Sequence, residues 1–453
     1  MIPRITIIMP SLNVADYIRQ CVESVQRQTL KEIEVLVVDA GSTDGTLEIL
    51  RGYEQKDLRI KIIRSEKKSY GYQLNRGIAL ARGQYVGVVE TDDIAEPDLC
   101  ERLYEAARET GADYVKGTAE GFFSSLTGEE LRYPMKVFTQ EEYNGCGGTI
   151  TVVPRKTPEL VLKDYYVWDG IYRREFIQGI QLNESGGAAF QDIGFMAQVH
   201  LKAEKAVYLD RLIYHYRRNS LNSSCGSKNT NAFRYLVQEY EYVDTLIRGR
   251  SEEWQRVMAQ KMFRQTMVRF RLMARNGEFW EASLQDMERL GRRVETAVSD
   301  GILTSSSLTE IEWYQAMCLC ASPKLLYEAC EKAVHDKIKA VQDIIDGMCD
   351  RQAVIFGCGR LGRYLQILLG NQKPGQIAAY CDNQCGETEE SVQGIKVFKP
   401  EEAVLKYPGA VYIIANRLHG DEMKSQLRSY GIGEEDIYIY AGKRDWMLVE
   451  KYL

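Results

Sequence analysis

The sequence predicts an α/β protein with a parallel α/β domain, a helical middle region and a second, smaller α/β domain at the C-terminal end. Near the N-terminus, the apolar runs 4–9 and 33–39 predict buried strands, with an amphipathic helix over about 16–28 between them. From about 229 to 350, apolar residues recur every three or four positions, as in packed helices. A strand at 352–356 then restarts the alternation of strands and helices. The predicted domains are 1–228, 229–350 and 351–453.

The composition is that of a globular enzyme with reduced cysteines. Of the 453 residues, 45% are hydrophobic, and the formal net charge is −6, which argues against a nucleic acid partner because binding phosphate backbones requires concentrated positive charge. The eleven cysteines have no regular spacing, and Cys381 and Cys385 lack the second pair that a zinc site requires. No run reaches about 18 apolar residues, and residues 1–4 lead directly into a strand. We therefore expect a cytoplasmic protein with neither a transmembrane segment nor a signal peptide.

The chain carries a cluster of acids, Glu90-Thr91-Asp92-Asp93, at the end of the apolar strand 85–89. Residues i and i+2 point the same way while the chain is extended, so Glu90 and Asp92 can converge on one point while Asp93 turns aside. Carboxylate oxygens suit Mg²⁺ or Mn²⁺, which keep open positions for substrate phosphates. The spacing predicts that Glu90 and Asp92 bind such an ion.

A second carboxylate stands at the end of a neighbouring predicted strand. Asp39 closes the strand 33–39, and the turn-rich loop 40–46 follows it. Because open α/β sheets bind ligands at the carboxyl ends of their parallel strands, Asp39 is predicted to lie at a ligand site.

Residues 5 to about 225 resemble a family 2 glycosyltransferase of the GT-A fold, a nucleotide-diphospho-sugar transferase with a Rossmann-like sheet. The resemblance rests on four ordered motifs: Pro10-Ser11-Leu12-Asn13, the segment 37–46, the segment 77–85, and Glu90-Thr91-Asp92-Asp93 with Pro97 after it. It implies that Asp39 binds the nucleotide base, that Pro10 and Asn13 line the nucleotide pocket, that Asn75 belongs to the donor site, and that Glu90 and Asp92 hold a metal ion on the diphosphate. The sequence departs from the family pattern at Ala40, Glu90 and Leu74, where the family usually has an acid, an Asp and an Arg.

The same resemblance assigns the catalytic base. A Gly-rich turn at 184–189 leads into Gln191-Asp192 and a predicted helix, where the family has a Glu-Asp pair whose Asp is the general base of inverting transfer. Asp192 is therefore the expected base, and the alternative is that it only caps the helix.

Basic residues and a histidine end the last strand of this region. Arg217 and Arg218 could clamp a diphosphate, because guanidinium matches phosphate geometry, or form a solvated rim. His215 lies between two tyrosines, which favours a packed, hydrogen-bonded ring over a metal ligand.

The helical middle region has two interpretations. The stretch 264–275 mixes apolar residues with four arginines and could hold an anionic membrane surface or a lipid-linked acceptor. A helical bundle that packs on its neighbours, or on a second subunit of a homo-oligomer, is the alternative that the pattern favours.

The C-terminal region carries a dinucleotide fingerprint. Gly357, Gly359 and Gly362 follow a strand and open a helix, and Asp382 ends the next strand about 20 residues later. This predicts a Rossmann-like fold that either binds NAD, S-adenosylmethionine or another nucleotide, or keeps the glycines for close packing. The segment resembles small Rossmann-like domains attached to bacterial sugar-modifying and sugar-transferring proteins.

These observations together predict an inverting, metal-dependent glycosyltransferase. It would move a sugar from a nucleotide-sugar donor, with UDP as the expected nucleotide, to a hydroxyl of a glycan or lipid-linked glycan in cell-surface polysaccharide synthesis. One alternative is a nucleotidyltransferase, which would need a basic Gly-rich loop where Pro10-Ser11-Leu12-Asn13 stands. The other is an oxidoreductase or methyltransferase that acts through the C-terminal domain.

Overall fold

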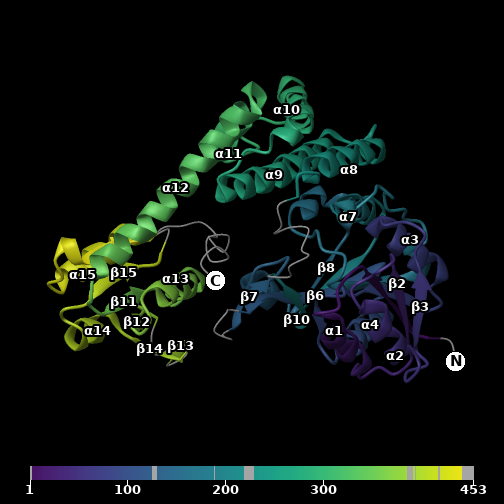
Figure 1. Ribbon diagram of the computed structural model, residues 1–453, viewed down its shortest axis with the longest axis horizontal. Helices are drawn as coiled ribbons and strands as arrows, with labels where there is room; N and C mark the ends of the chain where they lie inside the picture. Colours follow the sequence, from purple (N-terminus) through teal and green to yellow (C-terminus); the bar gives the residue numbers. More distant parts are fainter. Residues whose placement is uncertain are drawn as a thin grey trace. The chain divides into compact units, whose positions relative to one another are not determined.

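A computed structural model of the chain describes residues 3–124, 130–187, 189–218, 229–384, 391–392, 394–416 and 419–440 (Figure 1). The chain folds into two compact units, the first up to Tyr327 and the second from Glu328 onward. The helices that follow residue 229 fall in the first unit, where α8 packs on α7 and α9 packs on the short helix Pro158–Leu162, and the three-domain division stays a prediction. The long helix α12 (Pro323–Met348) runs from one unit into the next.

The first unit is built on a ten-stranded sheet whose N-terminal half is parallel. Its strand order is β3-β2-β1-β4-β9-β6-β10-β5, with β7 beside β6 and β8 beside β10. The parallel strands β1, β2, β3 and β4 alternate along the chain with helices, so their carboxyl ends share one edge of the sheet. The bounds of the strands are β1 Ile5–Ser11, β2 Ile33–Asp39, β3 Ile60–Arg64, β4 Tyr85–Val88, β5 Ile94–Ala95, β6 Tyr114–Ser124, β7 Glu130–Met135, β8 Thr149–Val152, β9 Gly170–Arg173 and β10 Ala206–Arg217.

Helices flank this sheet on both faces (Figure 1). The predicted amphipathic helix is α1, which buries Ile18, Cys21, Val22 and Val25 on one face but ends two residues before the predicted Gln28. The helix that carries the expected base, α7, is buried along most of its length. The bounds are α1 Ile18–Gln26, α2 Thr46–Glu54, α3 Tyr70–Leu80, α4 Leu99–Thr110, α5 Gln140–Gly145, α6 Arg174–Ile177 and α7 Gln191–Lys202.

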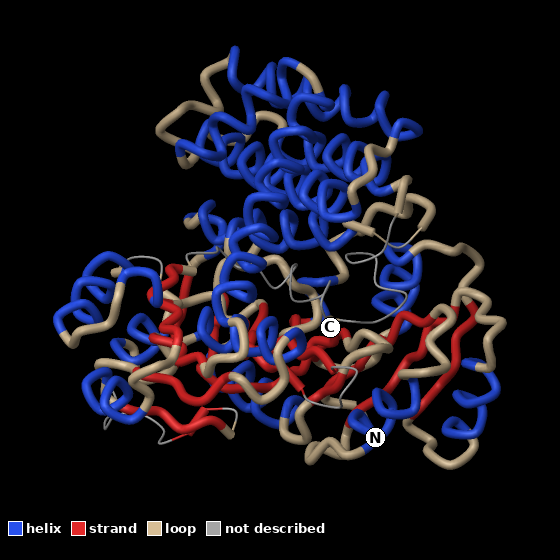
Figure 2. The backbone as a smooth tube through the Cα atoms, turned by 60° about the vertical axis from the view of Figure 1, so that its left-hand side comes forward, coloured by secondary structure: helices blue, strands red, loops and turns tan. Residues whose placement is uncertain are grey.

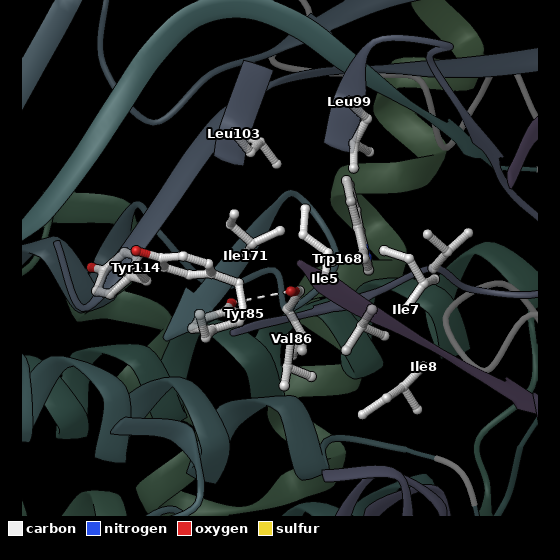
Figure 3. Packing of buried hydrophobic residues seen from close by; sticks show 14 of the residues in the cluster. Ile5, Ile7, Ile8, Tyr85, Val86, Leu99, Leu103, Tyr114, Trp168 and Ile171 are labelled. Atoms are coloured by element: carbon white, nitrogen blue, oxygen red, sulfur yellow. Dashed lines mark hydrogen bonds between the residues drawn. The ribbon is translucent and has the colours of Figure 1, made fainter. Parts of the chain in front are cut away.

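The core of the first unit lies on both sides of the central strands. Figure 3 shows Ile5 and Ile7 of β1 packed with Val86 of β4, Ile171 of β9 and the ring of Trp168. All of these side chains are buried. The apolar runs that predict β1, β2 and β4 as buried strands are therefore confirmed by the packing.

One strand is longer than the sequence predicts. The pattern places Pro10 in a loop, since proline interrupts the ladder of a central strand, but β1 continues through Pro10 to Ser11. The neighbouring strand β4 pairs only as far as Ile8, so no ladder partner lies beside Pro10 on that side. On that side the Pro10 carbonyl accepts a hydrogen bond from the Thr91 hydroxyl over 2.8 Å, which ties the acidic loop to β1.

Four helices after residue 229 complete the first unit: α8 (Ala232–Ile247), α9 (Glu252–Asn276), α10 (Leu284–Ser299) and α11 (Glu310–Ala321). They gather into a helical layer separate from the strands (Figure 2). The four arginines of 264–275 do not all face solvent, although Arg271 is exposed. Arg269 is buried over the ring of Phe190, and Arg264 pairs with Glu312 over 2.9 Å. The bundle interpretation describes this region, and no helix in the described ranges combines the length and apolarity needed to span a bilayer.

The second unit is a small, doubly wound sheet. Its order is β13-β14-β12-β11-β15-β16, parallel except for the β13–β14 pair. Counted along the chain, the parallel strands stand in the order 3-2-1-4-5, as in Rossmann-like folds. The bounds are β11 Ala353–Phe356, β12 Ile377–Cys381, β13 Ser391–Val392, β14 Ile395–Phe398, β15 Val411–Ile414, β16 Ile437–Ile439, α13 Arg360–Gln372, α14 Pro400–Lys406 and α15 Gly420–Ser429.

Candidate active site

The acidic loop after β4 lies at the carboxyl edge of the parallel strands. Glu90 accepts a hydrogen bond from the Tyr70 hydroxyl over 2.6 Å, and burial raises the pKa of Glu90 to about 8. Asp92 is partly exposed, and its negative charge raises the pKa of Glu90 further, so the two carboxylates are electrostatic neighbours. That both of them bind one cation stays a prediction.

Asp93 has a different role, as its position in the motif predicts. Its carboxylate is buried and accepts hydrogen bonds from the Tyr214 hydroxyl over 2.9 Å and from the Arg217 backbone N–H over 2.7 Å. The Tyr214 hydroxyl also accepts a hydrogen bond from the Glu90 N–H over 3.0 Å. Asp93 thus fastens the acidic loop to the end of β10.

Asp192 enters the same site from a segment a hundred residues away. It stands in the first turn of α7, after Phe190, whose φ of 74° is left-handed and turns the chain into the helix. Its charge raises the pKa of Glu90 and of Tyr70, which places Asp192 in electrostatic reach of the acidic loop. Burial raises the pKa of Asp192 itself, and the ammonium group of Lys261 partly offsets that rise.

Gln191 explains the loss of charge beside Asp192. Its buried side-chain amide donates hydrogen bonds to the Ser185 carbonyl, the Ser185 hydroxyl and the Gly187 carbonyl. A glutamate could not donate any of these. Gln191 therefore braces the Gly-rich turn in front of α7.

Polar side chains hold together the loop 40–46 that follows β2. Asn13, at a φ of 53°, accepts a hydrogen bond from Thr43 N–H over 2.8 Å and donates its own N–H to the Ser42 hydroxyl over 2.9 Å. The Asp39 carboxylate, only 2% exposed, accepts bonds from Gly41 N–H, Ser42 N–H and the Ser42 hydroxyl. Asp39 thus shapes the loop that follows β2, and Ala40 is buried beside it.

Two residues of α3 support the site rather than reach into it. Gln73 donates hydrogen bonds to the Ser11 and Val38 carbonyls, so it joins the ends of β1 and β2. Asn75, predicted to bind the donor, uses its amide on Leu182 and on Glu184 Oε1 instead. Leu74 is fully buried, which excludes a phosphate contact from that position.

The predicted diphosphate clamp is also engaged elsewhere. Arg217 donates hydrogen bonds to the Asp92 carbonyl over 2.8 Å and to Gln20, and its guanidinium lies over the Phe122 ring. The guanidinium of Arg218 lies 5.4 Å from the centroid of the Tyr216 ring. Arg217 therefore stabilises the acidic loop through the Asp92 carbonyl. Its position at a strand end does not predict this role.

His215 is packed between carboxylates, as its neighbours in sequence favour. Its ring nitrogens lie 2.5 Å from Glu96 Oε1 and 2.7 Å from Glu120 Oε1. Within the described ranges, no group of three or more His, Cys, Asp or Glu side chains is arranged to hold a metal ion.

A divalent cation at Glu90 and Asp92 nevertheless fits the donor set. Both side chains offer carboxylate oxygens, the ligands that Mg²⁺ and Mn²⁺ prefer, and two protein ligands leave positions for phosphate oxygens and water. Burial and the charges of Asp92 and Asp192 raise the pKa of Glu90, and a bound cation would oppose that rise.

An aromatic stack adjoins the acidic loop. The ring of Trp168 stacks on Tyr214 with centroids 4.3 Å apart, and on Tyr166 and Tyr216 at 4.5 and 5.1 Å. Beneath this stack, the buried ammonium group of Lys116 lies 2.5 Å from Asp164 and 2.7 Å from Asp169. The segment 167–176, which contains Asp169, is thus anchored by a buried ion cluster.

The helical layer supplies a residue that sequence reasoning missed. Lys261 of α9 is 4% exposed and donates a hydrogen bond to the Val161 carbonyl over 3.0 Å. Burial lowers the pKa of Lys261 to about 8, while Asp192 and Asp164 oppose that change. A lysine in an amphipathic helix gives no sequence signal for this position, because its hydrogen bond to Val161 spans 100 residues.

A cavity of about 810 Å³ lies within the helical layer and is not the donor site. Residues of α8, α9 and α10 line it, and the carboxylates of Glu90, Asp92 and Asp192 do not.

The Gly-rich loop of the second unit is closed by its own acid. Asp382 accepts hydrogen bonds from Cys358 N–H and Gln384 N–H, both over 3.0 Å, where the fingerprint predicts a ribose. A Cβ on Gly362 would lie 1.9 Å from the Gly357 carbonyl oxygen, so this glycine is required for packing of the helix on the strand. These contacts give the fingerprint a structural role, and we assign no NAD or S-adenosylmethionine to it.

Known proteins and a family model match the sequence of the first unit. The family model described as Glycosyl transferase family 2 matches residues 6–158. The glycosyltransferase EpsJ of Bacillus subtilis is 32% identical over 225 residues, which cover 48% of this chain and 62% of EpsJ. The glycosyltransferase GlyG of Streptococcus pneumoniae is 30% identical over 230 residues, which cover 48% of this chain and 71% of GlyG.

A solved structure shares the fold over a longer stretch. Residues 1–349 of TarS from Staphylococcus aureus, solved in complex with UDP-GlcNAc, superpose with a TM-score of 0.55 at 18% identity, covering 74% of this chain and 92% of that one. Sequence similarity to GlyG, the matching family model and the shared α/β fold agree, and the chain belongs to glycosyltransferase family 2.

Proposed function

We propose that the chain transfers a sugar, with inversion, from a UDP-sugar to a hydroxyl of a glycan or lipid-linked glycan. The observation that supports this proposal is that the charges of Asp92 and Asp192 both act on Glu90, which follows β4 at the carboxyl edge of the parallel strands. A site with two clustered acids and a third, separate carboxylate provides what sugar transfer from a diphosphate needs: a place for the leaving group and a base.

The donor would lie along the ends of β1, β2 and β4. The loop built by Asn13, Asp39 and Ser42 would receive the nucleotide, and Glu90 and Asp92 would hold a divalent cation against the diphosphate. When bound, such a cation stabilises the negative charge that develops on the leaving diphosphate. UDP is the expected nucleotide because the TarS structure of the same fold contains UDP-GlcNAc.

The proton is taken by Asp192. As the acceptor oxygen attacks the anomeric carbon, its proton passes to the Asp192 carboxylate and the bond from that carbon to the diphosphate oxygen breaks. Nucleoside diphosphate leaves with the electron pair, and attack from the opposite face inverts the configuration. Burial suits this role, because the raised pKa makes the Asp192 carboxylate a stronger base than an exposed aspartate.

Calorimetric titration of UDP into the intact protein tests the donor site. We expect binding with Mn²⁺ present, loss of binding with a chelator, and loss in Asp92→Asn. The matched control is Asp336→Asn, an exposed acid of α12 that should bind UDP as the wild type does. UDP-sugars are then screened for UDP release in the presence of glycan acceptors, with mass spectrometry of the product. Absence of binding in every condition, or equal binding by Asp92→Asn, would overturn the proposal.

A further inference from the structure

The helix that carries the base begins without a cap of its own. The residue before its first turn is Phe190, and no side chain at that position accepts a hydrogen bond from the helix. The first four N–H groups of a helix have no partner within it and need acceptors from elsewhere. Asp192 has the residue type that commonly supplies one, and the backbone N–H groups of Ile193 and of Asp192 itself lower the pKa of its carboxylate.

A different carboxylate takes this place. Glu239 of α8 accepts a hydrogen bond from the Gly194 N–H on Oε1 over 2.8 Å. Its side chain is buried, which raises the pKa of Glu239 to about 8, while the hydrogen bonds from Asn183 and Gly194 favour the carboxylate. Glu239 therefore caps α7 from another helix.

The same carboxylate binds the segment in front of α7. Its Oε2 accepts a hydrogen bond from the Asn183 side-chain amide over 3.0 Å. Asn183 in turn packs against the start of α3, where a Cβ on Gly71 would lie 2.0 Å from the Asn183 carbonyl oxygen. The next residue of α3 toward its start is Tyr70, which binds Glu90. Glu239 thus connects α7, the helix that carries Asp192, with the start of α3, where Tyr70 binds Glu90 of the acidic loop.

The close approach depends on a missing side chain. A Cβ on Gly194 would lie 2.3 Å from Oε1 of Glu239, which is too close for any contact between these atoms. Gly194 is in the middle of a helical sequence, where glycine weakens the helix by comparison with alanine. A glycine is required here because any side chain would displace the Glu239 carboxylate.

We propose that Glu239 is a positioning residue for sugar transfer: it holds the first turn of α7 and the segment before it from α8, and so fixes the place from which Asp192 faces the acceptor. This inference rests on the proposed function of Asp192 as the base. It also means that the helical layer, through α8, helps to position the catalytic base and is more than a linker between two domains.

Kinetics of Glu239→Ala and Gly194→Ala approach the contact from its two sides. The first removes the acceptor, and the second keeps Glu239 but pushes it away. We expect kcat to fall about 10- to 100-fold in both, as for a misplaced catalytic group, with the KM for donor and the affinity for UDP within about twofold of wild type. The double variant should be no slower than the slower single variant, because both break one interaction. The control Glu241→Ala, an exposed residue of the same helix that pairs with Arg289, should keep full activity.

Hydrogen exchange supplies a readout that does not need activity. The Gly194 amide should be protected in the wild type and in Glu241→Ala, and should exchange much faster in Glu239→Ala while the C-terminal half of α7 stays protected. Glu239→Gln should fall between wild type and alanine, because its single carbonyl can accept from Gly194 or from Asn183 but not from both.

The outcomes separate the two proposals. If the wild type binds UDP and transfers sugar but the variants keep its kcat, the positioning role of Glu239 is wrong while the proposed function stands. If kcat and UDP affinity fall together, Glu239 supports the fold in general and does not position the base. If the wild type transfers no sugar from any donor, the proposed function fails, and the catalytic role of Glu239 fails with it.

Discussion

Tyr214 donates a hydrogen bond from its hydroxyl to the Asp93 carboxylate over 2.9 Å, and this bond joins the acidic loop to β10. Both side chains are buried, and the same hydroxyl accepts a bond from the Glu90 N–H. The ring of Trp168 stacks on Tyr214, so the acidic loop, the end of β10 and the segment 167–176 meet at this tyrosine.

Tyr214→Phe tests this junction. The change leaves the Asp93 carboxylate and the Glu90 N–H each short of a partner, and a buried polar group without its partner costs about 1–3 kcal/mol. We expect lower stability in urea unfolding and weaker UDP binding with Mn²⁺, because the loop that presents Glu90 and Asp92 is loosened. Tyr314→Phe, at a tyrosine that is 60% exposed, is the control. Unchanged UDP affinity in Tyr214→Phe would show that the loop keeps its shape without this bond.

Asp192→Asn separates the base from the donor site. The amide keeps the size of the side chain but cannot take a proton, so kcat should fall by roughly 10²-fold or more while UDP affinity stays near that of wild type. The measurement is UDP release under saturating donor and acceptor. Transfer at the wild-type rate would mean that another group accepts the proton.

The acids of the site could be predicted from the sequence because their signal is local. Glu90 and Asp92 follow an apolar strand at the spacing that points both side chains one way, and Asp192 follows a Gly-rich turn. The strands β1, β2 and β4 could be predicted for the same reason, since buried strands need only a short apolar run.

The supporting residues could not be predicted, because each acts through a distant partner. Asn75 has the sequence position of a donor ligand, but its amide binds Leu182. Arg217 holds the Asp92 carbonyl, and Glu239 holds Gly194, across contacts of 125 and 45 residues. The periodicity of α8 predicts a packed helix but carries no information about which residue of α7 its carboxylate meets.

The acidity of the base should depend on Lys261. The groups that interact electrostatically with Asp192 are Lys261 of α9, Glu90 of the acidic loop, Tyr70 of α3, and Glu239 and Tyr240 of α8. Among these, Lys261 is the group whose charge favours the ionised carboxylate. Activity is lost as the pH falls through the pKa of the base, because a protonated Asp192 cannot accept a proton.

Lys261→Met should therefore move the acidic limb of the kcat/KM profile to higher pH. Without the ammonium group, the pKa of Asp192 rises further, so the base is lost at a higher pH than in wild type. The profile is measured from below pH 6 to pH 9 at constant ionic strength, with Lys61→Met, an exposed residue of β3, as the control. An acidic limb at the wild-type position would exclude Asp192 as the group that titrates.

The buried cluster at Lys116 should dominate the stability of the first unit. Lys116 lies between Asp164 and Asp169, and Gly170 makes room for its side chain, since a Cβ there would lie 2.7 Å from Lys116 Cγ. In Lys116→Met, two buried carboxylates lose their cation, and breaking a buried ion pair from one side costs about 3–5 kcal/mol. Urea unfolding should show this loss, against little change in Lys61→Met. A loss below about 1 kcal/mol would mean that the carboxylates take up protons without strain.

Substitution by alanine should lower the stability of the second unit at one of two fingerprint glycines and leave it nearly unchanged at the other. A Cβ on Gly362 would lie 1.9 Å from the Gly357 carbonyl oxygen, whereas a Cβ on Gly359 meets no atom within 4 Å. Gly359 also has an ordinary φ of −67°, which alanine adopts without strain. Gly362→Ala should lower the melting temperature of the second unit, because overpacking costs about 1–3 kcal/mol, and Gly359→Ala should change it little. Calorimetric scans of both variants make the comparison. If Gly359→Ala destabilises as much as Gly362→Ala, close packing of α13 on β11 is not what the fingerprint glycines provide.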